Sequence, residues 1–415
     1  MADSEWPLDW MVSVDDHVIE PSDLWQSRVP APLRDRAPRR VTDDGGEAWL
    51  YAGDRYPTYG LNAVAGKSAE EFGPEPVGYE EMRPGCYEPR ARVEDMNRDH
   101  VIASLCFPSF ARFAGQLFSL TPDRELGIAC IRAYNDWMLE EWTAAAPGRL
   151  LPLVIAPMWD PALAAAEVER CAAKGAKALA FSENPQPLGF PSIHDIDYWH
   201  PLFSTANDAG LPLCSHIGSS STFMSPTPDA PPLARVTYAV MAASAGTMIS
   251  WLFGGHFLRY PSLKLCLSEG GIGWMPHALE RAEHVYDKQR HWTLRSLEPD
   301  FKGRFADGAA INMHQAAVDM LRSGIRPTEL FRGHVYGCFF SDEAGLEQLD
   351  RIGEDNVMVE SDYPHSDSSW PNTMKVIGDQ LRHLPAPTQR KILQQNAMHV
   401  YNFTPPPPSQ ALGHE

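Results

Sequence analysis

The stretch from residue 11 to residue 20 reads MVSVDDHVIE, and its organisation recurs along the chain. A short apolar run, Met11 to Val14, leads directly into Asp15, Asp16 and His17. Continuous apolar strands are what a parallel sheet buried on both faces requires. We therefore interpret this stretch as a buried parallel strand that ends in polar and charged side chains.

Seven further apolar runs end in polar or charged residues in the same way. They cover residues 101–107, 151–156, 176–181, 211–214, 263–267, 335–340 and 357–359. Helical stretches separate most of them; residues 161–174, for example, form an amphipathic pattern with Asp160 as the expected N-cap. Eight alternations of strand and helix predict an α/β fold, a (β/α)8 TIM barrel.

The spacing of the strands predicts one barrel domain over residues 1–403, with long insertions after strand one and before strand seven. The first insertion contains residues 38–95, which we expect to form a cap, because long loops are usually functional lids. The second, residues 279–331, is mostly helical in pattern. Residues 404–415, TPPPPSQALGHE, are expected to be a disordered Pro-rich tail.

Composition excludes several classes of partner. The chain has 35 Lys and Arg against 54 Asp and Glu, a net charge of −19, which argues against binding of nucleic acid or of an anionic membrane. We see no signal peptide and no run of about 20 apolar residues that would span a membrane. The seven cysteines are scattered singly, which is typical of reduced thiols, so we expect a cytoplasmic protein. A homo-oligomer is compatible with the sequence.

Residues of metal-ligand type stand at four of the predicted strand ends. In a TIM barrel the catalytic groups come from these C-terminal ends. Each residue taken singly is explained by a turn or a helix cap, but four such ends around one axis favour a metal site. The candidate ligands are Asp15, His17 and Glu20 after strand one, His216 after strand five, Glu269 after strand six, and Asp362 with His365 after strand eight.

The number of carboxylates favours two ions. Asp15, Glu20, Glu269 and Asp362 would bring four negative charges, which two divalent ions balance and one does not. Burial of unpaired carboxylates costs several kcal/mol each. The mixture of carboxylate and imidazole suits iron or manganese, with zinc as a further possibility.

Signals for substrate binding are weaker. The hydroxyl-rich loop with Ser219 and Ser220, and Trp370 after strand eight, are candidates, although a plain loop and simple packing explain them as well. No Gly-rich dinucleotide motif or phosphate-binding loop is visible, so nucleotide chemistry lacks support.

The chain resembles the amidohydrolase-2 branch of the amidohydrolase superfamily, which also contains metal-dependent decarboxylases. The resemblance runs from Val14-Asp-Asp-His-Val-Ile-Glu-Pro21, through Phe181-Ser-Glu-Asn and His216-Ile-Gly-Ser-Ser-Ser221, to the stretch SDYPHSDSSWP at 361–371. The family's first-strand pair maps onto Asp15 and His17, its strand-five His onto His216, and its strand-eight Asp onto Asp362. Two departures are Glu269, where the family usually has His, and the lack of a Lys at the end of strand four.

A narrower resemblance is to the TIM-barrel nonheme di-iron monooxygenases of amidohydrolase ancestry that act in platensimycin and platencin diterpenoid biosynthesis. It implies two Fe ions, with O2 as the oxidant. It also implies an apolar, diterpenoid-like acyl group on a CoA thioester, and electrons from a separate reductase. The alternative is a mononuclear hydrolase or nonoxidative decarboxylase holding Zn or Mn. A barrel that has lost its chemistry is a third possibility.

Overall fold

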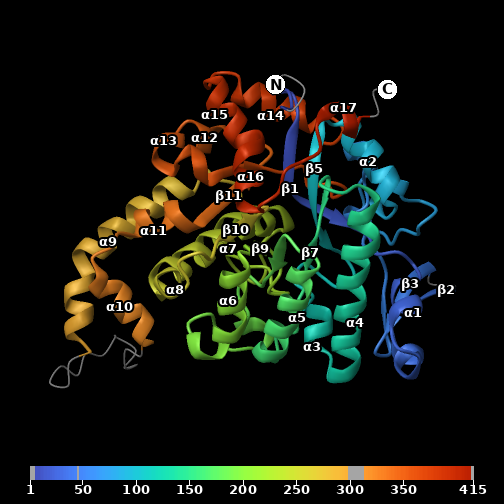
Figure 1. Ribbon diagram of the computed structural model, residues 1–415, viewed down its shortest axis with the longest axis horizontal. Helices are drawn as coiled ribbons and strands as arrows, with labels where there is room; N and C mark the ends of the chain where they lie inside the picture. The colour runs from blue at the N-terminus through green and yellow to red at the C-terminus, as the bar shows by residue number, and fades with distance from the viewer. Residues whose placement is uncertain (1–4, 44–45, 298–312, 413–415) are drawn as a thin grey trace.

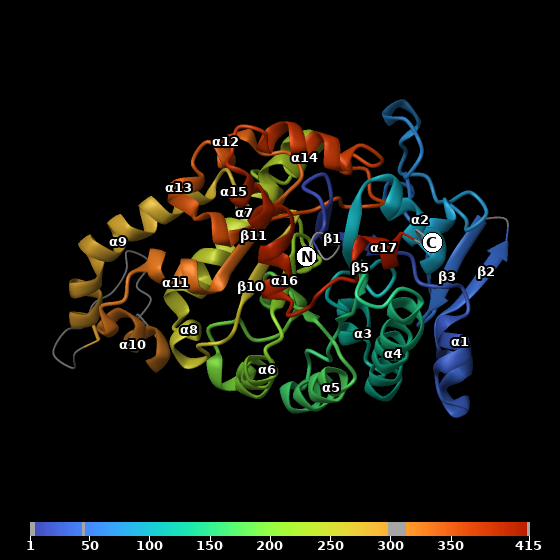
Figure 2. The same ribbon diagram turned by 45° about the horizontal axis from the view of Figure 1, so that its top comes forward.

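The computed structural model describes residues 5–43, 46–297 and 313–412, and its centre is a ring of parallel strands (Figures 1 and 2). Their order around the sheet is β6-β5-β1-β12-β11-β10-β9-β8-β7. The strands are β1 (Met11–Val18), β5 (Val101–Pro108), β6 (Leu150–Leu151), β7 (Leu153–Val154), β8 (Ala178–Ala180), β9 (Leu213–His216), β10 (Leu265–Ser268), β11 (Val335–Phe339) and β12 (Val357–Val359).

Two of these short strands close the ring. β6 pairs with β5 and β7 pairs with β8, and only Pro152 separates them along the chain. Proline lacks the N–H that a continuous ladder needs, so one strand is divided into two pieces. The ring thus has eight strand positions, one for each apolar run, and the predicted (β/α)8 barrel is confirmed.

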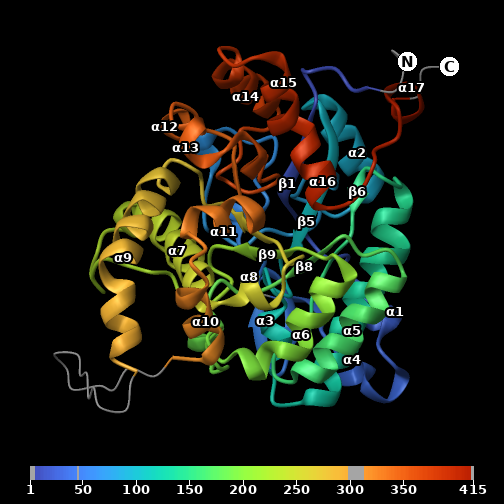
Figure 3. The same cartoon turned by 60° about the vertical axis from the view of Figure 1, so that its left-hand side comes forward.

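Helices surround the ring, with α7 and α9 on one side of Figure 3 and α4 and α5 on the other. The cap chemistry agrees with the sequence pattern, because the Asp160 carboxylate accepts from Ala162 and Leu163 N–H groups, each at 3.0 Å, at the start of α5. The longer helices are α2 (Pro89–Arg98), α4 (Arg124–Trp137), α5 (Pro161–Ala173), α6 (Ile196–Ala209), α7 (Pro232–Gly254), α9 (Met275–Arg295), α10 (Gln315–Ser323), α11 (Pro327–His334) and α14 (Thr373–Leu381).

The first insertion carries a small antiparallel sheet of β2 (Arg39–Asp43), β3 (Gly46–Tyr51) and β4 (Asp54–Tyr56). β3 and β4 pair as an antiparallel hairpin. Its turn uses Ala52 and Gly53, both with positive φ. β2 was not expected, because its sequence, RRVTD, is mostly polar and its side chains are largely exposed.

The Pro-rich segment differs from the expected disorder. Trp6 Nε1 donates to the Pro406 carbonyl at 2.8 Å, and residues 408–411 form the short helix α17 (Pro408–Ala411). The tail is thus hydrogen-bonded to Trp6 through the carbonyl of Pro406.

Helix α7 corrects the expectation that no apolar stretch of the chain is long enough to span a membrane. Its 23 residues include a window of mean hydropathy 1.4, so by length and composition this one helix is apolar enough to cross a membrane. Residues such as Met248, Trp251 and Leu252 are buried within the protein. Of this apolar window, 39% is buried inside the protein.

Candidate metal centre

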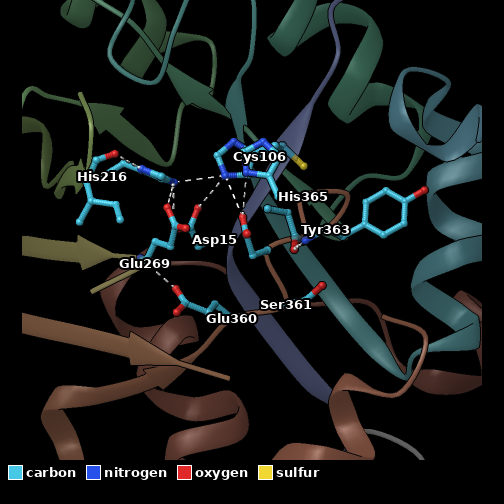
Figure 4. A network of polar contacts seen from close by, with 12 residues as sticks. Asp15, Cys106, His216, Glu269, Glu360, Ser361, Tyr363 and His365 are labelled. Carbon is cyan, nitrogen blue, oxygen red and sulfur yellow. Dashed lines mark hydrogen bonds and ion pairs between the residues drawn. The ribbon is translucent and has the colours of Figure 1, made fainter. Parts of the chain in front are cut away.

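Four fully buried side chains converge at the carboxyl ends of the strands. Asp15 and His17 come from β1, His216 is the last residue of β9, and Asp362 follows β12. Each offers one ligand atom, and these four atoms all lie within 4.8 Å of one another. The backbone fixes the approach of two of them, because Asp362 N–H donates to the Asp15 carbonyl at 2.8 Å. We call Asp15, His17, His216 and Asp362 the four-ligand group; Figure 4 labels two of its members.

The ligand atoms of this group lie close to one another. His17 Nε2 lies 3.0 Å from Asp362 Oδ1 and 3.2 Å from His216 Nε2. His216 Nε2 lies 3.6 Å from Asp15 Oδ2. The other nitrogen of His216, Nδ1, is 2.6 Å from the Ile217 carbonyl, to which only an N–H can donate. The neutral imidazole of His216 therefore directs its Nε2 lone pair into the group.

Burial sets the charge of each member. Burial lowers the pKa of His17, and lowers the pKa of His216 to about 4, so both imidazoles are neutral ligands. Burial would raise the pKa of Asp362, but His365 and His17 hold that pKa below its ordinary value. Burial, and then the Glu360 and Asp362 carboxylates, raise the pKa of Asp15.

The group fits a divalent cation. Neither Asp15 carboxylate oxygen has a hydrogen-bond donor among the described residues, and the same holds for both Asp362 carboxylate oxygens. Buried carboxylates without donors are costly unless a cation compensates them. Two carboxylates and two neutral imidazoles form a donor set of the kind that binds Mn²⁺, Zn²⁺ or Fe²⁺.

Glu269 and His365 stand at the border of the group. Glu269 Oε2 is 3.4 Å from His216 Nε2, and its side chain is 18% exposed. The His365 ring stacks on His17 with centroids 3.6 Å apart, and its Nδ1 is 3.3 Å from Asp362 Oδ1. Both side chains line the cavity above the group.

Glu20 is not brought into the group. Its buried carboxylate accepts from the N–H groups of Phe110 at 2.8 Å and Ala111 at 3.0 Å, so backbone dipoles already satisfy it. The expected balance of four carboxylates against two ions therefore fails. Asp15 and Asp362 are the two carboxylates of the four-ligand group, and one divalent ion matches their charge.

The two serines proposed for substrate binding support His216 instead. Ser219 Oγ donates to the His216 carbonyl at 2.6 Å and accepts from Glu183 N–H at 2.8 Å. Ser220 Oγ donates to the Glu183 carboxylate, also at 2.8 Å. Both hydroxyls are already hydrogen-bonded to protein groups, and neither residue is among the described residues that line the cavity.

Trp370 is also a packing residue. Its Nε1 donates to the Asp95 carbonyl at 3.1 Å, and the Arg83 guanidinium lies 4.8 Å from its ring centroid. It is absent from the walls of the cavity among the described residues. The expectation that Ser219, Ser220 and Trp370 contact substrate is therefore not met by their positions.

Two residues that support the site, Arg92 and Glu360, were not predicted as site residues from the sequence. The buried Arg92 guanidinium donates to the His17 carbonyl, and to the Gly85 carbonyl at 2.7 Å. Glu360 accepts from Cys338 Sγ at 2.6 Å. It also accepts from Glu269 N–H at 3.2 Å, a contact drawn in Figure 4. Arg92 lies 75 residues from His17, and no local pattern indicates that they meet.

The cavity above the group has a volume of about 550 Å³. Its floor includes Glu269, Asp362 and His365, and one wall is the turn after β5 with Phe110 and Phe113. The first insertion contributes residues from Trp49 to Asn62, whereas none of the described residues in 279–331 lines the cavity. Aromatic rings thus face a polar floor, the mixture of apolar walls and a few polar groups that is typical of a small-molecule site.

The amidohydrolase family model matches residues 23–403. Among curated proteins, a gamma-resorcylate decarboxylase of Rhizobium radiobacter is 24% identical over 264 residues, 61% of this chain and 73% of that protein. A 2-amino-3-carboxymuconate-6-semialdehyde decarboxylase of Dictyostelium discoideum is 23% identical over 340 residues, 79% of this chain and 80% of that protein.

Solved structures share the fold. An amidohydrolase from Mycobacterium avium subsp. paratuberculosis K-10 has a TM-score of 0.67 at 20% identity, covering 94% of this chain and 97% of that one. A 5-carboxyvanillate decarboxylase of Novosphingobium aromaticivorans, complexed with manganese, has a TM-score of 0.59 at 15% identity, covering 95% and 96%.

These relatives correct the functional expectation. The similar curated proteins are decarboxylases, so a di-iron monooxygenase acting in diterpenoid biosynthesis is the wrong interpretation. The expected acyl-CoA substrate, external reductase and pair of iron ions lose their support with it. The amidohydrolase resemblance itself is confirmed, because the family model covers most of the sequence. The chain belongs to the amidohydrolase family.

Proposed function

We propose that this protein is a metal-dependent nonoxidative decarboxylase of aromatic carboxylic acids, with one divalent ion, Mn²⁺ or Zn²⁺, held by Asp15, His17, His216 and Asp362. The observation that carries the proposal is the convergence of these four buried side chains beneath a cavity of about 550 Å³ with aromatic walls. The decarboxylase relatives, which act on gamma-resorcylate and 5-carboxyvanillate, support the same class of substrate.

The reaction needs few participants. The bond between the ring carbon and the carboxylate breaks, CO2 leaves, and the electron pair left on the ring carbon takes up a proton. When bound, the ion supplies positive charge that holds an anionic oxygen of the substrate. No oxidant or reductant takes part, which agrees with a site that combines one metal position with a proton carrier.

Binding and orientation fall to the walls of the cavity. Phe110 and Phe113 present rings beside the floor, and the Phe113 ring centroid is 4.0 Å from that of His216. An aromatic acid stacked on this wall would keep its carboxylate directed at the floor. The apolar rings also exclude water from the carbon that is to be protonated.

We assign to Glu269 the role of donating the proton to the ring carbon. It faces the cavity, lies outside the four-ligand group, and its Oε2 is 3.4 Å from His216 Nε2. Burial raises the pKa of Glu269, and the nearby Asp362 carboxylate raises it further, which favours the protonated carboxyl group that a proton donor needs. Glu360 accepts the Glu269 N–H at 3.2 Å and thereby fixes its backbone.

The test is release of CO2 by the Mn²⁺-loaded protein under nitrogen, without reductant, from hydroxybenzoates such as 2,6-dihydroxybenzoate. In D2O the product should carry one deuterium at the vacated carbon. His17→Ala should abolish turnover, whereas His100→Ala, at a side chain that is 45% exposed, should not. Turnover that requires O2, or a product that retains its carboxylate, would overturn the proposal.

The sequence prediction of a cytoplasmic protein belongs with this proposal. All seven cysteines are free and buried, which supports a reducing compartment.

A further inference from the structure

The cavity contains two arginines, and they differ in how their charge is compensated. Arg55 forms an ion pair with Asp43 and donates to the Gly46 carbonyl at 3.1 Å. Arg112 has no carboxylate at ion-pair distance in the part of the chain that the structure describes, although it lines the same cavity and is exposed. An arginine that faces a substrate cavity without a protein partner is a ready anion receptor.

The backbone holds Arg112 in an uncommon conformation. Its φ is +61°, in the left-handed region that costs a residue with a side chain on the order of 1 kcal/mol. Two backbone hydrogen bonds hold this turn. Arg112 N–H donates to the Ser109 carbonyl at 3.2 Å, and Gly115 N–H donates to the Arg112 carbonyl at 2.8 Å. The side chain therefore starts from a defined position at the cavity wall.

Glu20 fixes the same turn from beneath. Its carboxylate accepts the N–H groups of Phe110 and Ala111, directly before Arg112. On the other side, the Phe113 ring packs on His216 of the four-ligand group. One short turn thus connects the His216 imidazole to Arg112, which is exposed and lines the cavity.

We propose that Arg112 binds a second anionic group of the substrate, a carboxylate distinct from the one that is lost. This inference rests on the proposed function and names its substrate class, a dianionic aromatic acid. A bound divalent ion would neutralise Asp15 and Asp362, while Arg55 is neutralised by Asp43. Of the two arginines that line the cavity, Arg112 is the one without a carboxylate partner among the described residues, and its planar guanidinium can accommodate both oxygens of a second substrate carboxylate.

The experiment compares two probes that differ by one carboxylate, 3-hydroxybenzoate and 5-hydroxyisophthalate. Dissociation constants are measured by calorimetry on the Mn²⁺-loaded protein. The wild type should bind the dianion about tenfold more tightly, corresponding to about 1.4 kcal/mol. Arg112→Gln should remove this preference and leave the affinity for the monoanion unchanged, and Arg112→Lys should restore part of it.

Arg55→Gln is the matched control, because Arg55 lines the same cavity but is already paired. It should leave the ratio of the two affinities unchanged. Equal affinity of the wild type for both probes, or loss of the preference in Arg55→Gln rather than Arg112→Gln, would overturn the role of Arg112.

The two proposals fail separately. If no aromatic acid releases CO2 but the Arg112-dependent preference for the dianion persists, the decarboxylase assignment is wrong and the anion site stands. If CO2 is released with the same kcat/KM from a monoacid and from its diacid counterpart, the function stands and the anion site is wrong.

Discussion

The Nε2 atoms of His17 and His216 lie 3.2 Å apart in a fully buried place. Because His216 donates from Nδ1 to the Ile217 carbonyl, its Nε2 presents a lone pair to the other ring. Burial lowers the pKa of both imidazoles and keeps them neutral. A hydrogen bond between the two rings that requires a protonated imidazolium is therefore unfavourable. A metal ion held by His17, His216, Asp15 and Asp362 would satisfy all four side chains.

Metal binding should stabilise the folded protein. At an Mn²⁺ concentration 100 times the Kd, the free energy of unfolding should rise by about 2.7 kcal/mol. Asp15→Asn should abolish this gain, because it removes a ligand charge, whereas Asp350→Asn on the exposed surface should retain it. Thermal unfolding with and without Mn²⁺ measures the difference; an unchanged gain in Asp15→Asn would place the ion elsewhere.

Glu269→Gln should retain the metal and lose turnover. The amide is nearly isosteric with the carboxyl group but carries no transferable proton, so kcat should fall by about 10²–10⁴-fold. Elemental analysis and CO2 release on the same sample separate the two effects. Loss of the ion together with activity would make Glu269 a ligand rather than the proton carrier.

Arg92→Met should destabilise the barrel around β1. It leaves the carbonyls of His17 and Gly85 without their buried donor, which should cost about 2–4 kcal/mol of unfolding free energy. Arg98→Met is the matched control, because that side chain is 62% exposed. Urea denaturation of both variants tests this, and equal midpoints would show that Arg92 has no structural role.

His256 should make stability depend on pH. Its ring is buried beside Trp251, with centroids 4.4 Å apart, and neither ring nitrogen has a partner among the described residues. Burial lowers the pKa of His256 to about 3, below the ordinary value of 6.5 in the unfolded chain. The unfolded state therefore binds more protons between pH 6.5 and 3, and stability falls as pH falls through this range.

The slope attributable to His256 is about 1.4 kcal/mol per pH unit. His256→Leu should remove that slope, so the pH dependence of its unfolding free energy between pH 6.5 and 4 should be flatter than that of the wild type. Denaturation curves at several pH values measure it. Parallel curves for the two proteins would contradict the assignment.

The fold was predictable because burial on both faces leaves a direct trace in sequence. Each of the eight strand positions appears as a continuous apolar run, whereas β2, with polar exposed residues, leaves none. β1 also continues through Asp15 and His17 to Val18, which the apolar pattern alone does not indicate.

The site was predictable only in part. Strand-end position anticipates that Asp15, His17, His216 and Asp362 could meet, but it does not reveal what already satisfies a side chain. Glu20 stands three residues after His17, yet its carboxylate turns to the N–H groups of the 110–111 turn. With Glu20 counted as a ligand, the four carboxylates predicted two ions. The prediction of two ions in turn favoured the di-iron oxygenase, which is wrong.

The number of ions bound per chain tests the central claim most directly. The apo-protein is titrated with Mn²⁺, the excess is removed, and manganese and protein are quantified in the wild type, His216→Ala and Glu20→Gln. One ion per chain in the wild type and in Glu20→Gln, with none in His216→Ala, is the predicted result. Two ions in the wild type falling to one in Glu20→Gln, or an ion retained in His216→Ala, would contradict a single site built from the four-ligand group.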